Sequence, residues 1–487
     1  MKRVIAIIGL LILAFLWMKA QHYQTVYPDR VAYFADQSNY IKCIRIDSVL
    51  IQSDLIFYPF ANIQQLDYEC YTPYGPSWIG EKIMVNDSFS LFFNLKNDTI
   101  KIKTNAALNE SWVAYELPDS TTITATVIDF DTMSFLEQLD SVKTIGFQVY
   151  DEFMTPVDHI LNHMTIIISR HHGIIKTFNF YLFPDYSTEY FLTETFQVYE
   201  LIGLSKPEIG IQNLTWFDIF DFQPGDELHI LYHSNCWEPE YGSYSTTHKT
   251  VTKYISRIDY PDSILYVTLT ESSVLNDFND EKSFSYRIDT IRSVIKSNTN
   301  FDKLPGEPVI DSYQAYANSM VYNDPLIKSE PPYEEWISGE GYLCWHMPVA
   351  DGCFFSKNYY KGLGGPYYSC TSYFTCIGET NNDLVYYKKG SKTWGTPLNM
   401  SDIPDASYNP KIEFYPNPAD EKVTIMINSH SLPATFELID LDGKKIMQRI
   451  INTETTTVSL DEIPEGIYVY KTIDNRGFVS YGKLLVQ

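Results

Sequence analysis

Short runs in which apolar and polar residues alternate recur along most of the chain. Phe89–Phe93, Ile100–Lys103 and Thr121–Val127 are examples, and they are rich in β-branched and aromatic residues. A period of two is typical of strands that bury one face. Helical spacing is sparse, and Met133–Leu139 is where we expect one or two helical turns. The pattern therefore predicts a mainly β protein.

Most of these runs follow an aspartate and a hydroxyl residue. The pairs are Asp87-Ser88, Asp98-Thr99, Asp119-Ser120, Asp140-Ser141 and Asp262-Ser263. Their short side chains bond to the neighbouring backbone, so each pair is expected to form a turn before the next strand. Successive hairpins predict antiparallel sheets in the main body. We find no repeat of fixed period that would indicate a propeller or a solenoid.

Composition along the chain suggests several domains. A length of 487 residues allows more than one buried core. Residues 297–332 are polar with scattered Pro, Asn and Gly, and they are expected to be a loop region or linker. We expect a signal peptide at 1–20, an antiparallel β domain at 21–205, a second β-rich region and linker at 206–332, a cysteine- and glycine-rich module at 333–398, a tether at 399–412 and a small β-sandwich at 413–487.

The final segment carries the most specific motifs. Strand-like runs such as Val423–Ile427 and Ile467–Lys471 are separated by turn residues such as Asp442-Gly443. The motif positions are Tyr415, Pro416, Asn417, Pro418, Gly443, Leu460, Pro464, Gly466, Tyr468 and Lys483. Together they resemble the type A sorting domain of type IX (Por) secretion cargo in Bacteroidetes.

That resemblance implies a fold, a destination and partners. The fold would be an immunoglobulin-like sandwich that the outer-membrane translocon of type IX secretion reads. A sortase-like peptidase often removes this domain and attaches the cargo to surface lipopolysaccharide. The expected location is therefore outside the cell or on its outer surface. A second segment, Tyr74–Gly80, resembles parts of uncharacterised secreted Bacteroidetes proteins, and this resemblance implies no function.

The other end of the chain agrees with export. Met1-Lys2-Arg3 is positively charged, Val4–Trp17 is apolar, and Ala20 is a small residue at the expected cleavage point. This pattern is typical of a secretory signal peptide. No later run reaches the roughly 18 apolar residues of a spanning helix, so no transmembrane segment is expected in the mature chain.

The charge balance limits the partners. Removing Lys2, Arg3 and Lys19 leaves 33 basic and 61 acidic residues, a formal charge of −28. Such a chain repels nucleic acid and anionic lipid, so neither is expected as a partner. The high aromatic content could serve glycan stacking, but tyrosine is also a common strand residue.

All seven cysteines lie in the exported part, where disulfides are expected. The disulfide candidates are Cys43, Cys70, Cys344, Cys353, Cys370 and Cys376. The last four lie close together and are expected to form two bridges, whereas Cys43 and Cys70 would form a third. Cys236 would then be unpaired. The spacings differ from those of structural zinc sites, so we expect neither a metal nor a cofactor.

One pair of residues could form a catalytic site. His172-Gly173 follows an apolar strand, and Cys236 follows another. This faintly resembles the His-Gly and Cys dyad of caspase- and gingipain-like peptidases. Asn235 replaces the usual alanine, and the surrounding hairpins do not resemble that family's α/β sheet. The alternative is that Arg170–Gly173 is a polar hairpin loop between strands at 165–169 and 174–180.

No other motif for catalysis or nucleotide binding is present in the sequence. The sequence therefore predicts a secreted or surface-attached β protein whose main body binds a ligand or forms part of the cell surface without catalysis. The alternative is an exported hydrolase that acts on peptides or glycans, with carboxylates such as Glu238 and Glu240 as candidates for sugar chemistry.

Overall fold

The structure, a computed structural model, describes most of the chain after the predicted signal peptide. It describes residues 23–487 except 67–69, 185–195, 239–241, 280, 340–343, 348–354, 373–376, 401–412, 428–430, 441–443 and 476–478. Helix in these residues is limited to α2 (Trp216–Ile219) and to two 3-10 turns, η1 (Ile160–His163) and η2 (Tyr333–Glu335). The predicted mainly β, antiparallel fold is confirmed. The signal peptide and most of the tether lie outside the described residues.

The chain forms two compact units that are each built from separate segments. Unit 1 comprises residues 1–219, 298–350 and 356–361, and unit 2 comprises residues 220–297, 351–355 and 362–487. The segments of the two units alternate along the sequence. The linear domain order expected from composition therefore differs from the grouping by contacts.

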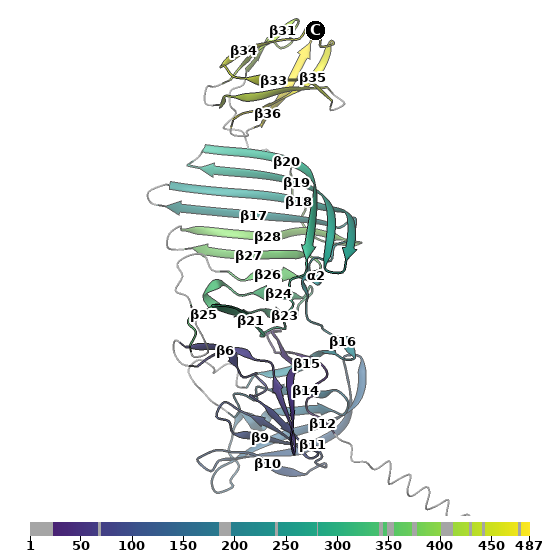
Figure 1. Ribbon diagram of the computed structural model, residues 1–487, viewed down its shortest axis with the longest axis vertical. Helices are drawn as coiled ribbons and strands as arrows, with labels where there is room; N and C mark the ends of the chain where they lie inside the picture. Colours follow the sequence, from purple (N-terminus) through teal and green to yellow (C-terminus); the bar gives the residue numbers. More distant parts are fainter. Residues whose placement is uncertain are drawn as a thin grey trace, which may run out of the picture. The chain divides into compact units, whose positions relative to one another are not determined.

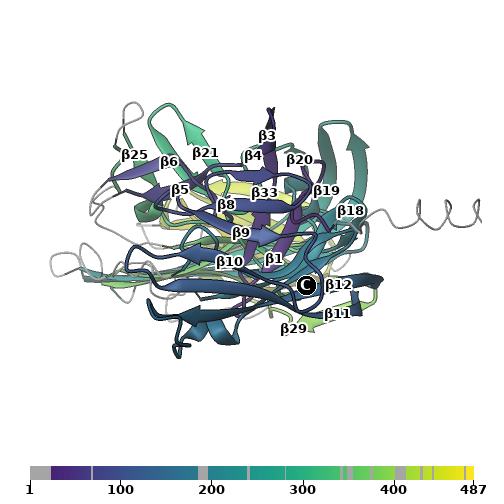
Figure 2. The same cartoon turned by 90° about the horizontal axis from the view of Figure 1, so that it is seen from below.

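Unit 1 contains two large antiparallel sheets, and most of their strands are labelled in Figure 1 or Figure 2. The first has the order β10-β11-β12-β13-β14-β15-β1-β2, with β16 beside β15. Its strands are β1 (Ala32–Ala35), β2 (Ile41–Ile44), β10 (Ser111–Glu116), β11 (Thr122–Phe135), β12 (Gln138–Tyr150), β13 (Thr165–Ser169), β14 (Gly173–Phe178), β15 (Val198–Ser205) and β16 (Glu208–Gly210). The second sheet, β3-β4-β7-β8-β9, comprises β3 (Ile46–Ile51), β4 (Leu55–Pro59), β7 (Ile83–Val85), β8 (Phe89–Phe93) and β9 (Thr99–Lys103).

These two sheets share one hydrophobic core. Phe92 and Ile100 from the second sheet belong to the same buried cluster as Ile145, Ile166 and Phe178 from the first. Alternate residues of β8, β9 and β12 are buried, as the sequence pattern predicts. The rings of Phe92 and Phe180 stack within the cluster at a centroid distance of 4.2 Å. The body of unit 1 is therefore a sandwich.

The hairpin of β11 and β12 corrects two expectations from the sequence. Met133–Leu139 is not helical, because Leu136 and Glu137 form a two-residue turn in which both φ angles are positive. Such a turn matches the twist of the flanking strands. Asp140-Ser141 is not a turn either, because both residues lie inside β12. The predicted hairpin of β13 and β14 is present, with Gly173 at a φ of 86°.

The rest of unit 1 consists of short strands. They are β5 (Asn62–Gln65), β6 (Tyr71–Gly75), β21 (Pro308–Asp311), β22 (Gln314–Ala317), β23 (Ser319–Val321), β24 (Ile327–Glu330), β25 (Ile337–Ser338) and β26 (Lys357–Tyr360). Strands β5, β6, β22 and β25 contribute to a small second cluster. Ala315, Ile337 and Trp345 form the cluster's buried centre. Residues 297–332, expected to be a linker, thus contain four strands.

Unit 2 contains a sheet of unusually long strands, and Figure 1 shows them side by side in the order β20-β19-β18-β17-β28-β27. They are β17 (Glu227–Glu238), β18 (Gly242–Tyr260), β19 (Ser263–Phe278), β20 (Glu281–Lys296), β27 (Gly364–Ser372) and β28 (Gly378–Lys389), with β29 (Lys392–Gly395) beside β28. Consecutive hairpins build β17 to β20, and β28 then pairs with β17 from a distant part of the sequence.

The C-terminal part of unit 2 is a small two-sheet sandwich. One sheet has the order β30-β31-β34 and the other β33-β32-β35-β36. The strands are β30 (Glu413–Tyr415), β31 (Lys422–Met426), β32 (Ala434–Ile439), β33 (Lys445–Ile451), β34 (Thr455–Ser459), β35 (Gly466–Ile473) and β36 (Val479–Val486). Val423 and Ile425 of one sheet share a buried cluster with Phe436, Leu438 and Leu484 of the other. The predicted C-terminal sandwich is present.

Candidate functional site

A pocket in unit 1 begins at the tight loop between β1 and β2. The carboxylate of Asp36 accepts hydrogen bonds from the backbone N–H of Ser38 at 2.8 Å and of Tyr40 at 2.9 Å. Asn39 adopts a positive φ of 65°, which an asparagine tolerates well. The backbone of Tyr40 then bridges to Val321 of β23. This loop is fixed by its own bonds, and the Tyr40 side chain remains 52% exposed.

Aromatic side chains form the buried part of the pocket lining. Trp78 and Phe60 are almost fully buried, and the indole N–H of Trp78 donates to the carbonyl of Cys43 at 2.9 Å. Trp78 also packs against Tyr199 with ring centroids 4.8 Å apart. Burial raises the pKa of the Cys43 thiol. Cys43 is therefore a protonated, apolar part of the lining and not a nucleophile.

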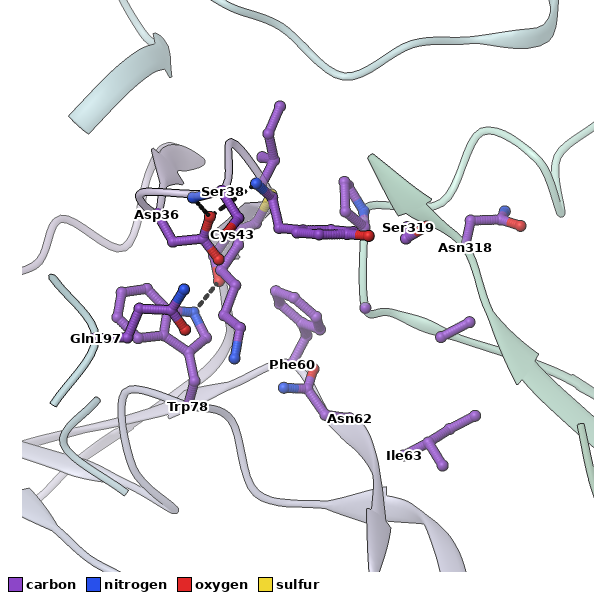
Figure 3. A pocket seen from close by; sticks show the side chains of 16 residues that line it. Asp36, Ser38, Cys43, Phe60, Asn62, Ile63, Trp78, Gln197, Asn318 and Ser319 are labelled. Carbon is purple, nitrogen blue, oxygen red and sulfur yellow. Dashed lines mark hydrogen bonds between the residues drawn. The ribbon is translucent and has the colours of Figure 1, made fainter. Parts of the chain in front are cut away.

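Amide side chains supply much of the polar lining. Figure 3 shows Trp78 and Gln197 on one side of the pocket, Asn318 and Ser319 on the opposite side, and Asn62 between them. With the oxygen and nitrogen of its amide exchanged, Asn62 donates to the carbonyl of Gly306 at 3.2 Å. Asn318 is 2% exposed, and its side-chain oxygen has no hydrogen-bond partner among the described residues.

The lining combines aromatic and amide side chains with few charged groups. The pocket has a volume of about 590 Å³ and contains one carboxylate, Asp36, and one ammonium group, Lys42. Among the described residues that line it, there is no histidine and no second carboxylate. Hydrolysis of peptides or glycans needs a paired acid and base or an activated nucleophile. Amides and aromatic faces instead match a small polar molecule that also has an apolar face.

The candidate histidine of the possible His-Cys dyad, His172, belongs to a different cluster. Its Nδ1 lies 3.1 Å from Asp140 Oδ2 and 3.2 Å from Ser169 Oγ. His171 Nδ1 lies 2.9 Å from Asp140 Oδ1, and the His171 backbone N–H donates to Asp140 Oδ2 at 2.9 Å. A catalytic triad places the serine and the carboxylate on opposite nitrogens of the imidazole. Here both contact Nδ1, and Ser169 is fully buried.

Asp140 is the residue that organises this cluster, and no motif in the sequence marks its role. Burial acts to raise the pKa of Asp140, but the hydrogen bonds from Ser169, His171 and His172 outweigh burial and lower it. The Asp140 carboxylate thus holds the β13–β14 turn together. The turn at Leu136–Glu137 places Asp140 inside β12, where its side chain is buried.

The cysteines pair differently from the prediction. Cys70 forms a disulfide with Cys344 at a Cα–Cα distance of 5.1 Å, so the predicted pairing of Cys70 with Cys43 is wrong. Cys43 is a buried free thiol on β2. Cys236 and Cys370 are both disulfide-bonded. Cys236 is therefore not a thiolate in this structure, and Cys353 and Cys376 lie outside the described residues.

Two buried lysines also lie in unit 1. Lys328 Nζ donates to the carbonyl oxygens of Lys303, Leu214 and the Asn213 side chain at 2.7–3.0 Å. Lys143 Nζ donates to the carbonyls of Thr104 and Ala106. Burial lowers the pKa of Lys328 to about 7 and that of Lys143 to about 8.

In the C-terminal sandwich, the predicted motif residues bond to one another across the fold. The Asn417 side chain donates to the carbonyl of Lys483 at 2.7 Å and accepts from the backbone N–H of Leu485 at 3.0 Å. Ala419 adds two backbone bonds, to Leu485 and Gln487. The Tyr415–Pro418 motif thereby fastens strand β36.

The second motif closes the other side of the sandwich. Tyr468 Oη donates to the carbonyl of Pro464 at 2.8 Å. Leu460 is buried, and its backbone N–H donates to the carbonyl of Glu421 at 2.7 Å. Gly443 lies outside the described residues. These contacts show that the motif residues build the fold of residues 413–487.

Comparison with known families identifies this sandwich. Residues 413–487 match the family of secretion system C-terminal sorting domains. This sorting domain directs export to the cell surface or beyond and implies an interaction with the type IX machinery. Within the described part of the chain, no helix is both long and apolar enough to cross a membrane.

Other comparisons add little about the body that the sorting domain follows. No curated protein matches the sequence. Two solved extracellular domains from B. thetaiotaomicron, assigned to a one-component system and to a hybrid two-component system, align with 96% of this chain and 98% of their own length. Sequence identity is 8% and the TM-score is 0.14 in both cases, values too low to support a shared fold.

Proposed function

We propose that the protein is a type IX secretion cargo whose body binds a small polar ligand in the pocket of unit 1 without catalysis. The observation that carries the proposal is the pocket lining, which combines aromatic faces with the amides of Asn62, Gln197 and Asn318. A saccharide is the ligand class that matches this lining, because its C–H face packs on aromatic rings and its hydroxyls bond to amides.

A glycan-binding screen on the purified chain, followed by calorimetry, tests the ligand. Tyr40→Ala removes an exposed aromatic side chain whose fold-stabilising contacts are made by its backbone. We expect the variant to fold and to bind about tenfold more weakly. Tyr313→Ala is the matched control, because Tyr313 is 63% exposed and does not line the pocket. An equal loss of ligand affinity in both variants would contradict the assignment of the ligand to this pocket.

A hydrolase screen separates binding from catalysis. Asp36 supplies the one carboxylate of the pocket. Turnover of a peptide or glycan that disappears in Asp36→Asn would replace the binding proposal with the hydrolase alternative. Binding without turnover supports the proposal.

Export is tested separately from binding. We expect a chain that lacks residues 413–487 to accumulate in the periplasm, because it lacks the sorting domain. Fractionation followed by immunoblotting measures the distribution. Appearance of the truncated chain in the medium at the level of the intact chain would refute the role of this domain.

A further inference from the structure

Strand β20 is a long edge of the main sheet in unit 2. It comprises Glu281–Lys296, sixteen residues, and among the described strands it pairs with β19 alone (Figure 1). A long edge strand presents a row of unpaired N–H and C=O groups. Such an edge is a template for another strand.

The β19–β20 hairpin determines which backbone groups of β20 face outward. Phe278 pairs with Glu281, and the register continues without a bulge to Ser263 and Lys296. Next to that last pair, the backbone N–H of Ser297 donates to the carbonyl of Asp262 at 3.1 Å. Hydrogen-bonded pairs alternate along an antiparallel ladder. Odd-numbered residues of β20 therefore bond to β19. The even-numbered residues from Lys282 to Lys296 direct their N–H and C=O groups away from the sheet.

Apolar side chains accompany these outward backbone groups. Tyr286, Ile288 and Val294 are even-numbered and 39%, 53% and 52% exposed. Natural edge strands usually avoid exposed apolar rows because these favour pairing. On β20 the row lies on one face along most of the strand.

Charge then selects the register in which β20 could pair with another copy of itself. The outward groups of one copy must bond to the outward groups of the other. An antiparallel two-fold axis at any single residue position satisfies this condition, because it pairs even-numbered residues with even-numbered residues. Centring on Arg287 or Asp289 would place two like charges opposite each other. Centring on Ile288 places Arg287 of each copy opposite Asp289 of the other. Within each chain Arg287 and Asp289 already form an ion pair with each other, and both side chains are exposed.

We propose that two copies of the chain pair antiparallel through β20 about a two-fold axis at Ile288. The two long sheets become one continuous sheet, in which the outward groups from Lys282 to Val294 of each copy bond to the other. The Ile288 side chains meet at the centre, and two Arg287–Asp289 pairs flank them. This inference concerns assembly and does not rest on the proposed ligand.

Cysteine cross-linking of the full chain tests the register. A hydrogen-bonded antiparallel pair has a Cα–Cα distance of about 5.5 Å, which a disulfide can span. Ile288→Cys is therefore expected to give a cross-linked dimer on a non-reducing gel. Thr290→Cys is the matched control, because in this register residue 290 faces Tyr286 of the other copy. Efficient cross-linking at 290 instead of 288 would overturn the proposed register.

Charge exchange tests the pairing in solution. Light scattering after size exclusion is expected to show a dimer for the intact chain. Arg287→Glu should shift it to monomer, and adding Asp289→Arg in the same chain should restore the dimer. Lys388→Glu on the interior strand β28 makes the same change of charge away from the edge and should leave the dimer intact. A monomeric intact chain at every concentration, or loss of the dimer that the double exchange does not reverse, would overturn the proposal.

Discussion

At the scale of single residues, Asp140 shows how one buried carboxylate stabilises a surface turn. It accepts hydrogen bonds from the Ser169 hydroxyl, the His171 backbone and both histidine rings. Asparagine keeps the shape but loses the charge and one acceptor. We expect Asp140→Asn to lower the free energy of unfolding by about 1–3 kcal/mol, measured by denaturant unfolding. Asp129→Asn, an exposed position on β11, is the control. Equal stability of the two variants would contradict the role of Asp140.

The buried lysines predict a pH dependence of stability. Lys328 has a folded-state pKa of about 7 and an ordinary unfolded-state pKa near 10.4. Between these values the unfolded state binds the extra proton, so stability rises with pH. We expect the free energy of unfolding to increase by about 2 kcal/mol from pH 7 to pH 9. Lys328→Met should flatten this rise, whereas Lys388→Met, on an exposed side chain, should not. An unchanged slope in Lys328→Met would refute the assignment.

Buried tyrosines set the upper limit of the pH range in which stability rises. Burial raises the pKa of Tyr33 and of Tyr316 to about 12. Above pH 10 the unfolded state loses these protons while the folded state retains them, so stability falls. Stability should therefore be greatest near pH 9 to 10. The same denaturation series measures this maximum.

At the scale of elements, the sequence predicted what local chemistry determines. The alternation in β8 and β9 and the hairpin of β13 and β14 follow from side-chain period and turn residues. The β11–β12 turn was missed because Leu136 and Glu137 rarely adopt positive φ, so no turn residue marked it. The pairing of β17 with β28 was also missed, since nothing local links strands more than a hundred residues apart.

The pocket was missed for a related reason. Asp36, Asn62 and Asn318 come from distant segments and form no motif of fixed spacing. The sorting domain could be predicted because its motifs are short and local. Its internal bonds, such as the one from Asn417 to Lys483, became evident only in the fold.

The Asn417 contacts give a prediction for the sorting domain. Asn417→Ala removes two hydrogen bonds to β36. The substitution should lower the free energy of unfolding of the sorting domain by about 1–2 kcal/mol, measured by thermal unfolding. Export, measured as the fraction of protein outside the cell, should fall in parallel. Asn452→Ala, at an exposed position after β33, is the control. Normal stability together with lost export would show instead that the machinery contacts Asn417 directly.

At the scale of the whole molecule, disulfides connect distant parts of the sequence. The Cys70–Cys344 bond joins residues 274 positions apart. Alkylation of the denatured, unreduced chain followed by peptide mapping should label Cys43 but not Cys70, Cys344, Cys236 or Cys370. Label at Cys236 would contradict the pairing and restore a thiol there.

The position of β36 has a consequence for synthesis. It follows every other strand of the sorting domain in the sequence, yet Asn417 and Ala419 bond to it from the first motif. A ribosome that stops before residue 479 releases a chain in which β35 has an open edge and Asn417 has lost both partners. A product truncated in this way therefore cannot complete the fold of residues 413–487.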